Sequence, residues 1–123
     1  MIDLERVRDF KVLLVGDAII DEYVYVKTIG KAIKENALSS ILGRREEFRG
    51  GVWAAAAHVL NFCDRVDIMT GPQIMRNSRL VDDVYLRKLF VTHELVENTK
   101  NGFDPDIGAY DLVIICDFGH GTL

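Results

Sequence analysis

Three short apolar segments, each followed by glycine, constrain the fold of this chain more than any other feature. They are Val12–Val15, followed by Gly16; the segment DRVDIMTG, which ends in Gly71; and Leu112–Cys116, followed by an aspartate and two glycines. Continuous apolar runs of this length are typical of strands buried on both faces, as in parallel sheets. The pattern predicts an α/β fold with a mainly parallel sheet, in which three buried strands each end at a glycine.

Acidic residues stand at two of these predicted strand ends. Asp17 follows the first strand, with Asp21 four residues later, and Asp117 follows the third. In open α/β sheets, ligands bind beyond the carboxyl ends of the strands. We therefore interpret Asp17, Asp21 and Asp117 as candidate substrate-binding residues, in preference to acid–base or metal-binding roles. A solvated turn at Asp17 and a simple polar strand end at Asp117 are the alternatives.

The segment after the first strand has a different pattern. Tyr23 and Tyr25 alternate with Val24 and Val26, so that both faces of this strand are apolar and both need cover. Residues 38–48 can form a second strand beside it. We predict a small β-flap over about residues 22–48, with the tyrosines facing a pocket and the valines left for a partner. A hairpin is predicted around residues 74–81 and 85–95, and a loop over 97–111.

A helix is predicted from Val52 to Phe62, directly after the pair Gly50–Gly51. Its residues are nearly all apolar or alanine, which predicts burial on most of its surface. Because glycine has no Cβ, a ligand oxygen could reach the free N–H groups at the helix start. The alternative is that the two glycines only make a sharp turn from strand to helix.

Composition limits the class of protein. The chain has 123 residues, 49% hydrophobic and 28% charged, which predicts a single globular domain over residues 1–123. A net charge of −4 and the lack of a dense basic run argue against a nucleic-acid partner. No apolar run is long enough to span a bilayer and the N-terminal segment is charged, so we predict no membrane partner and a cytoplasmic location. Cys63 and Cys116 are expected to be buried free thiols.

The remaining polar residues give weaker signals. His58, His93 and His120 lack metal-ligand spacing, so packing is the expected role of His58 and no metal site is predicted. No Ser/His/Asp or Cys/His arrangement indicates nucleophilic catalysis, and no catalytic residue is predicted. Cations in the flap could meet the phosphate of a ligand, but a solvated face is the preferred interpretation. These cations are Lys27, Lys31, Lys34, Arg44, Arg45 and Arg49, and a second group, Arg76, Arg79, Arg87 and Lys88, is expected to solvate the hairpin.

Taken in order, these motifs resemble the N-terminal half of the ribokinase-like (PfkB) carbohydrate kinases. The closest likeness is to the kinase domain of bifunctional heptose-phosphate kinase/nucleotidyltransferases. A G-D-x-x-x-D pattern is matched by Gly16, Asp17 and Asp21, and a Pro-Glu-like flap element is matched loosely by Glu35 in IKEN. The paired glycines match Gly50 and Gly51, and D-[YF]-G-x-G matches residues 117–121.

The resemblance implies a role for each matched position. The acid matching Asp21 binds sugar hydroxyls, and Gly50 and Gly51 let the substrate lie against the helix start. Glu35, Asp17 and Asp117 join them as substrate-binding candidates. The flap is expected to close over the sugar and to pair with the flap of a second subunit, which predicts a homodimer. Complete relatives transfer phosphate from ATP to a sugar hydroxyl with the help of Mg²⁺.

The nucleotide-binding G-x-G-D motif of that family has no match in this sequence. We therefore expect a truncated ribokinase-like fold that binds a sugar or sugar phosphate, binds neither ATP nor Mg²⁺ tightly, and is inactive alone. The end at DFGHGTL suggests an incomplete reading frame or an excised fragment. The alternative function is a non-enzymatic kinase-like module that binds a sugar or a protein partner.

Overall fold

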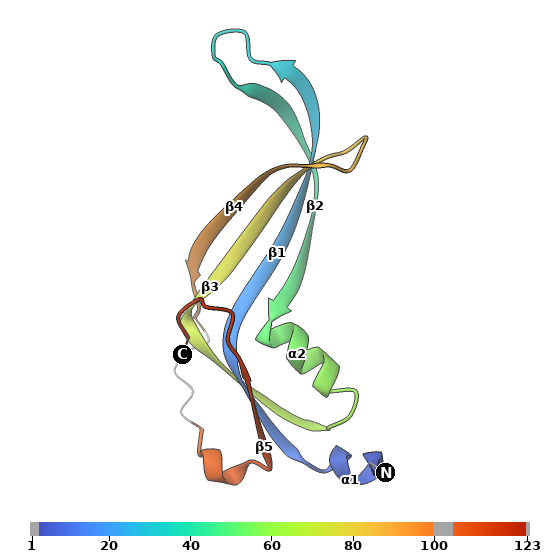
Figure 1. Cartoon of the computed structure of the whole chain (residues 1–123), viewed down its shortest axis with the longest axis vertical. Helices are drawn as coiled ribbons and strands as arrows, with labels where there is room; N and C mark the ends of the chain where they lie inside the picture. The colour runs from blue at the N-terminus through green and yellow to red at the C-terminus, as the bar shows by residue number, and fades with distance from the viewer. Residues whose placement is uncertain (1–2, 100–104, 123) are drawn as a thin grey trace. The chain divides into compact units, whose positions relative to one another are not determined.

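The computed structural model of the chain describes residues 3–99 and 105–122. Figure 1 shows its helices and strands along the chain. In chain order they are α1 (Leu4–Arg8), β1 (Lys11–Lys31), β2 (Leu38–Gly51), α2 (Val52–Val59), β3 (Arg65–Asp82), β4 (Lys88–Glu97), the 3-10 helix η1 (Ile107–Ala109) and β5 (Leu112–Cys116).

The five strands of the described residues form one mixed sheet. Four of them lie in the order β2-β1-β3-β4, and β5 pairs with β1. β5 runs parallel to β1, with Val12 opposite Leu112 and Gly16 opposite Cys116. β1 with β2, and β3 with β4, are consecutive strands that form antiparallel hairpins (Figure 1). The prediction of a mainly parallel sheet is therefore wrong, because short turns let consecutive strands pair directly.

Two predicted strand ends are also wrong. β1 continues through Gly16 and Asp17 as far as Lys31, and β3 continues through Gly71 as far as Asp82. A glycine in a strand can mark a close approach of another backbone as well as an end. Only the third predicted strand, β5, ends where the sequence suggested, at Cys116.

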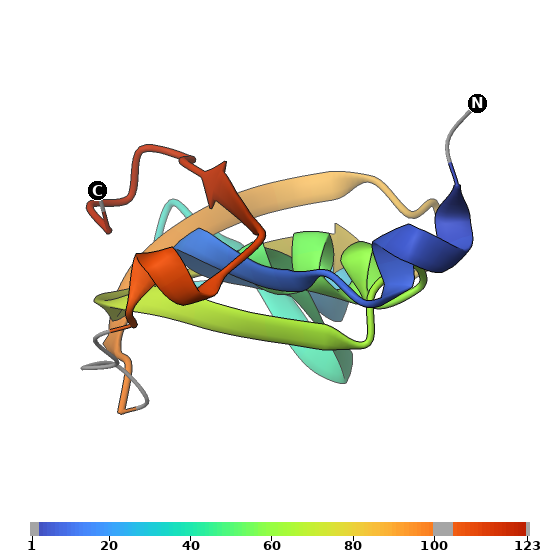
Figure 2. The same cartoon turned by 90° about the horizontal axis from the view of Figure 1, so that it is seen from below.

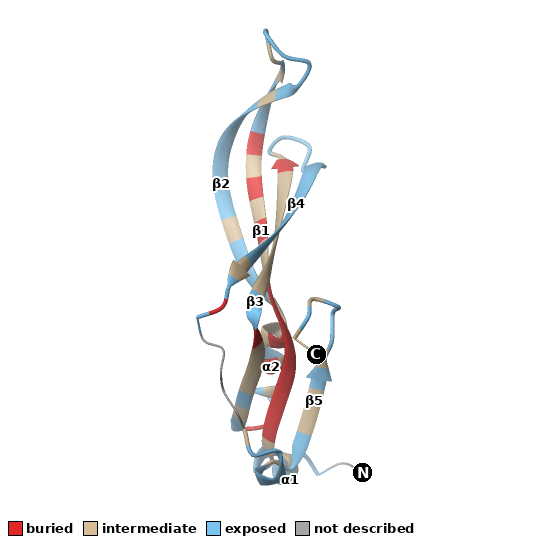
Figure 3. Cartoon of the chain, turned by 90° about the vertical axis from the view of Figure 1, so that its left-hand side faces the viewer, coloured by how far each residue is buried: buried red, intermediate tan, exposed pale blue. Residues whose placement is uncertain are grey.

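The chain divides into two compact units, which we describe separately. Unit 1 comprises residues 1–19, 49–75 and 95–123, and unit 2 comprises residues 20–48 and 76–94. In unit 1, Val12, Leu14 and Ala18 of β1 pack with Val52 and Ala56 of α2 and with Cys63. Figure 2 shows this unit from the end at which α1 and η1 lie. The first part of β1 is the most deeply buried strand segment of unit 1 (Figure 3).

Burial in unit 1 corrects three expectations. α2 ends at Val59 and only Val52 and Ala56 are buried, so the helix is not covered on most of its surface. β5 is half-exposed rather than buried on both faces. Cys63 is buried as predicted and Cys116 is half-buried, and both are free thiols.

Unit 2 consists of two β-hairpins. The first is the predicted flap, formed by the later part of β1 and most of β2. The backbone N–H of Ala32 donates to the carbonyl of Ala37 near its turn (2.8 Å). The second is the predicted 74–95 hairpin, where the N–H of Asp82 donates to the carbonyl of Arg87 (2.8 Å). Two adjacent hairpins supply the unit with more strand pairing than an isolated hairpin has.

The two faces of β1 in unit 2 differ in burial. Val24 and Val26 are buried within the chain, whereas Tyr23 and Tyr25 are half-buried. The alternation predicted from the sequence is thus confirmed, but the valine face is covered here and is not left for a partner. Of the exposed large apolar side chains of this unit, more than half lie on the outer strands β2 and β4.

No helix among residues 3–99 and 105–122 is long and apolar enough to cross a membrane.

Candidate functional site

Asp17 is buried in unit 1, where its carboxylate holds the segment that follows β5. Its Oδ2 accepts hydrogen bonds from the N–H groups of Phe118 (2.8 Å) and His120 (3.1 Å), and its Oδ1 accepts one from the N–H of Thr122 (3.1 Å). Burial raises the pKa of Asp17, but the hydrogen bonds from the Thr122 side chain and from these three backbone groups outweigh it and lower the pKa to about 2. Asp17 is therefore a charged anchor for this segment at neutral pH.

Asp117 lies in that anchored segment and is exposed. Its Oδ1 accepts a hydrogen bond from the N–H of Gly119 (2.9 Å). Gly119 and Gly121 have φ angles of 78° and 94°, in the left-handed region that favours glycine. The structure thus places Asp117 at the surface of a turn that Asp17 fixes, and its role in substrate binding stays a prediction.

Gly51 has a structural reason to be glycine. It is the N-cap of α2 with a φ of 61°, and a Cβ at this position would lie 2.3 Å from the carbonyl oxygen of Asp17. Gly50 precedes it at the end of β2. The close backbone approach and the positive φ support the sharp turn that the sequence analysis gave as the alternative. Contact of either glycine with a substrate stays a prediction.

Asp21 lines an open groove in unit 2, with a volume of about 400 Å³. Two strands form it, with Asp21, Tyr23 and Tyr25 from β1 and Glu46 and Phe48 from β2. Residues of one parity share a face in each strand, so the alternating pattern brings these five side chains to one side. The rings of Tyr23 and Phe48 meet edge to face at 5.9 Å between centroids. The prediction that both tyrosines face a pocket is confirmed.

Two arginines hold the acids of this groove. Nη1 of Arg79 on β3 lies 2.9 Å from Oδ1 of Asp21, and the Arg79 guanidinium lies 5.5 Å from the Tyr23 ring centroid. Arg44 on β2 forms an ion pair with Glu46 and stacks on Tyr25, at 3.8 Å from guanidinium carbon to ring centroid. Arginine prefers this geometry because its flat guanidinium can stack on a ring and pair with a carboxylate at the same time.

Glu35, the other candidate in unit 2, lies in a different hollow. That hollow has a volume of about 520 Å³ near the tip of the first hairpin. The structure therefore does not bring Glu35 and Asp21 into one pocket. Its lining residues are Ile29, Lys31, Ala32, Ile33, Lys34, Glu35 and Ser39.

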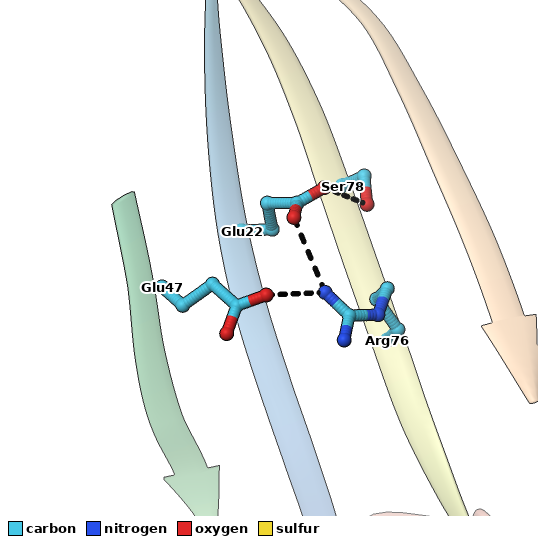
Figure 4. A network of polar contacts seen from close by, with 4 residues as sticks. All are labelled: Glu22, Glu47, Arg76 and Ser78. Atoms are coloured by element: carbon cyan, nitrogen blue, oxygen red, sulfur yellow. Dashed lines mark hydrogen bonds and ion pairs between the residues drawn. The ribbon is translucent and has the colours of Figure 1, made fainter. Parts of the chain in front are cut away.

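A second polar network occupies the opposite face of β1 in unit 2. Nη1 of Arg76 lies 3.2 Å from Glu22 and 2.6 Å from Glu47, and the hydroxyl of Ser78 donates to Glu22 at 2.9 Å (Figure 4). Arg76 lowers the pKa of Glu47 through a hydrogen bond and through its charge. Because Asp21 and Glu22 pair with β3 residues on opposite faces, a slip of one residue between β1 and β3 would break both sets of contacts.

The expected role of the second basic group is thus corrected at two positions. Arg76 and Arg79 were expected to solvate the hairpin, but both are largely covered and ion-paired. Sequence reasoning also missed Glu46 and Phe48 as lining residues of the groove, and Arg79 as the partner of Asp21. The alternation in β2 was a signal for the first two, but the position of Arg79 depends on the pairing of β1 with β3.

Packing was predicted for His58, but its side chain is exposed on α2, because the apolar residues of this helix face β1. His93 is exposed and bonds to Asn77, with 2.6 Å between Nδ1 and Oδ1. Among the described residues, no three His, Cys, Asp or Glu side chains are grouped so that they could hold a metal ion.

Comparisons with known proteins found partial likenesses to solved structures. No protein-family model and no curated protein matches the chain. A solved structure described as "a putative ribokinase" from Agrobacterium tumefaciens is 15% identical, with a TM-score of 0.42, over 87% of this chain and 44% of the other. A carbohydrate kinase from the same organism is 15% identical, with a TM-score of 0.36, over 69% of this chain and 35% of the other. The chain thus spans less than half the length of either protein. A particular closeness to heptose-phosphate kinases stays a prediction.

Proposed function

We propose that this chain is the sugar-binding part of a ribokinase-like (PfkB) carbohydrate kinase. The observation that carries this proposal is the groove of unit 2, where Asp21 lies among three aromatic side chains. Complete members of that family phosphorylate a sugar or sugar phosphate with ATP, and the whole activity is part of the proposal.

The chemistry of the groove suits a sugar ring. A carboxylate accepts hydrogen bonds from hydroxyl groups, and Asp21 supplies one that is partly covered and oriented by Arg79. The apolar C–H faces of a sugar can pack on aromatic rings, which Tyr23, Tyr25 and Phe48 provide. A few placed polar groups within an apolar lining are the usual composition of a small-molecule site. In this proposal Asp21 binds the sugar, and Tyr23 and Tyr25 support its ring.

Nucleotide and metal ion have no proposed site in this chain. The sequence has no G-x-G-D motif. We propose that the chain alone binds ATP and Mg²⁺ weakly at most and is inactive as a kinase. Asp17, Asp117, Gly50, Gly51 and Glu35 stay proposed substrate contacts from the resemblance alone.

Asp21→Ala tests the sugar-binding role directly. We expect this change to weaken sugar binding by at least about tenfold, because a hydrogen bond to a charged group contributes roughly 1.5–3 kcal/mol. Binding can be followed by ligand-observed NMR and the fold by circular dichroism. Asp83→Ala is the matched control, since it removes an exposed acid of unit 2 that does not line the groove. Equal binding by both variants would contradict the proposed site, and loss of folding in Asp21→Ala alone would make Asp21 structural.

We also propose a homodimer joined through the flap. β2 lies at one end of the strand order β2-β1-β3-β4, and Ile41 and Leu42 on it are each more than half exposed. An apolar edge strand is a surface that favours association. Ile41→Lys combined with Leu42→Lys should shift the chain from dimer to monomer in light scattering at tens of micromolar. Phe90→Lys on β4 is the control, and a dimer that only this control disrupts would place the interface on β4.

The exposed apolar side chains of β2 and β4 also favour a second candidate function, a non-enzymatic kinase-like module that binds a partner. Sequencing the source reading frame beyond Leu123 separates the two proposals. A downstream G-x-G-D in the same frame supports the kinase, and a stop codon directly after Leu123 supports the module.

A further inference from the structure

We propose that the groove of unit 2 binds a neutral sugar ring in preference to the phosphate ester of the same sugar. This inference rests on the proposed sugar-binding function and names the class of ligand. It concerns the groove lined by Asp21, Tyr23, Tyr25, Glu46 and Phe48.

The charges that line the groove are both negative. Asp21 and Glu46 are its charged lining residues, and the other three side chains are aromatic. A phosphate monoester carries close to two negative charges at neutral pH. Where it meets the lining directly, its oxygens face carboxylate oxygens, which repel them and cannot donate hydrogen bonds to them.

The nearby cations are already engaged. Arg79 pairs with Asp21 at 2.9 Å, and Arg44 pairs with Glu46 while its guanidinium stacks on Tyr25. Each cation balances one acid, so the groove and its two arginines together have no net charge. The remaining guanidinium N–H groups could contact a phosphate, but each arginine already balances one acid, so the charge of a bound phosphate would stay uncompensated. Lys31 and Lys34, the lysines that line a hollow in this unit, line the separate one near the hairpin tip.

The same balance disfavours a cationic ligand. Aromatic rings with acids can hold an ammonium group, but here each tyrosine ring already has a guanidinium near it, at 3.8 Å for Tyr25 and 5.5 Å for Tyr23. A neutral polyol needs no charged partner. Its hydroxyls can donate to the carboxylate oxygens while the two ion pairs stay in place.

Matched ligands test this inference on the full 123-residue chain. We would measure saturation-transfer NMR binding of ribose, fructose and glucose against ribose 5-phosphate, fructose 6-phosphate, glucose 6-phosphate and glucosamine at pH 7.5 and low salt. For any sugar that binds, we expect the neutral form to bind at least about fivefold more tightly than its phosphate, as repulsion from two nearby carboxylates implies. Tighter binding of a phosphate or of glucosamine overturns the inference but leaves the proposed sugar-binding function standing. Binding of none of the seven ligands contradicts the proposed function and this inference together.

Glu46→Gln locates the preference in this groove. The change removes one lining charge and frees Arg44, so the ratio of neutral-sugar to phosphate affinity should fall by about threefold or more. Asp83→Asn, which removes an exposed acid of unit 2 that lines neither hollow, should leave the ratio unchanged. An equal response of both variants would show that general charge, and not the groove, sets the preference, and would overturn the inference.

Discussion

Asp17→Ala should lower the free energy of unfolding by about 3 kcal/mol at pH 7, because three partly buried backbone donors lose a charged acceptor. Those donors are the N–H groups of Phe118, His120 and Thr122, which lie 2.8–3.1 Å from the carboxylate. The Asp17 side chain is almost fully buried, so water cannot replace it without a rearrangement of the segment after β5. Urea unfolding followed by circular dichroism gives the change.

The same residue should make stability depend on acid pH. The pKa of Asp17 is about 2 in the folded chain, against an ordinary value of 3.8. A lowered folded pKa means that the unfolded chain takes up the proton first, so the stabilisation is complete above pH 4 and is lost as pH falls toward 2. The loss should be about 2 kcal/mol. Asp17→Asn should lack this component of the pH dependence.

Asp117→Ala is the control for both measurements. Asp117 lies in the same segment but is exposed, with a single local hydrogen bond to Gly119. Removing the Asp117 side chain should lower the free energy of unfolding by less than about 1 kcal/mol. If Asp17→Ala were as stable as this control, Asp17 would not anchor the segment, and its carboxylate would be free for another role.

Gly16→Ala should destabilise the chain by about 3 kcal/mol, because a Cβ here has no space. It would lie 2.1 Å from the carbonyl oxygen of Cys116 and 2.7 Å from the Cys116 Cβ. Gly16 and Cys116 are opposite each other in the parallel pair of β1 and β5. The new methyl group can be accommodated only if the two strands separate at this point, which breaks the end of the ladder.

Gly108→Ala is the matched substitution. A Cβ at Gly108 would lie 3.4 Å from Oδ1 of Asp106, an ordinary contact, and Gly108 does not have a positive φ. Gly108→Ala should lower the free energy of unfolding by no more than about 1 kcal/mol. Thermal unfolding followed by circular dichroism compares the two variants. Equal melting temperatures would mean that β5 does not approach β1 as closely as the structure has it.

The sequence determined the elements that depend on local pattern. The apolar start of β1, the alternation of tyrosine and valine from Tyr23 to Val26, and the two hairpins were all readable, because the side-chain period of a strand is two. The groove face of β1 followed from the same alternation. The free thiol of Cys63 and its burial followed from its apolar surroundings.

The tertiary structure alone decided which strands pair and what each glycine does. Gly16 suggested a strand end, but β1 continues because the glycine makes room for β5, a strand about a hundred residues later. Arg79 reaches Asp21 because β3 lies beside β1, and no local pattern encodes that neighbour. The same kind of long-range contact makes Asp17 an anchor for the segment after β5. Local spacing fixes which face a side chain occupies, but contacts between distant segments fix what it meets there.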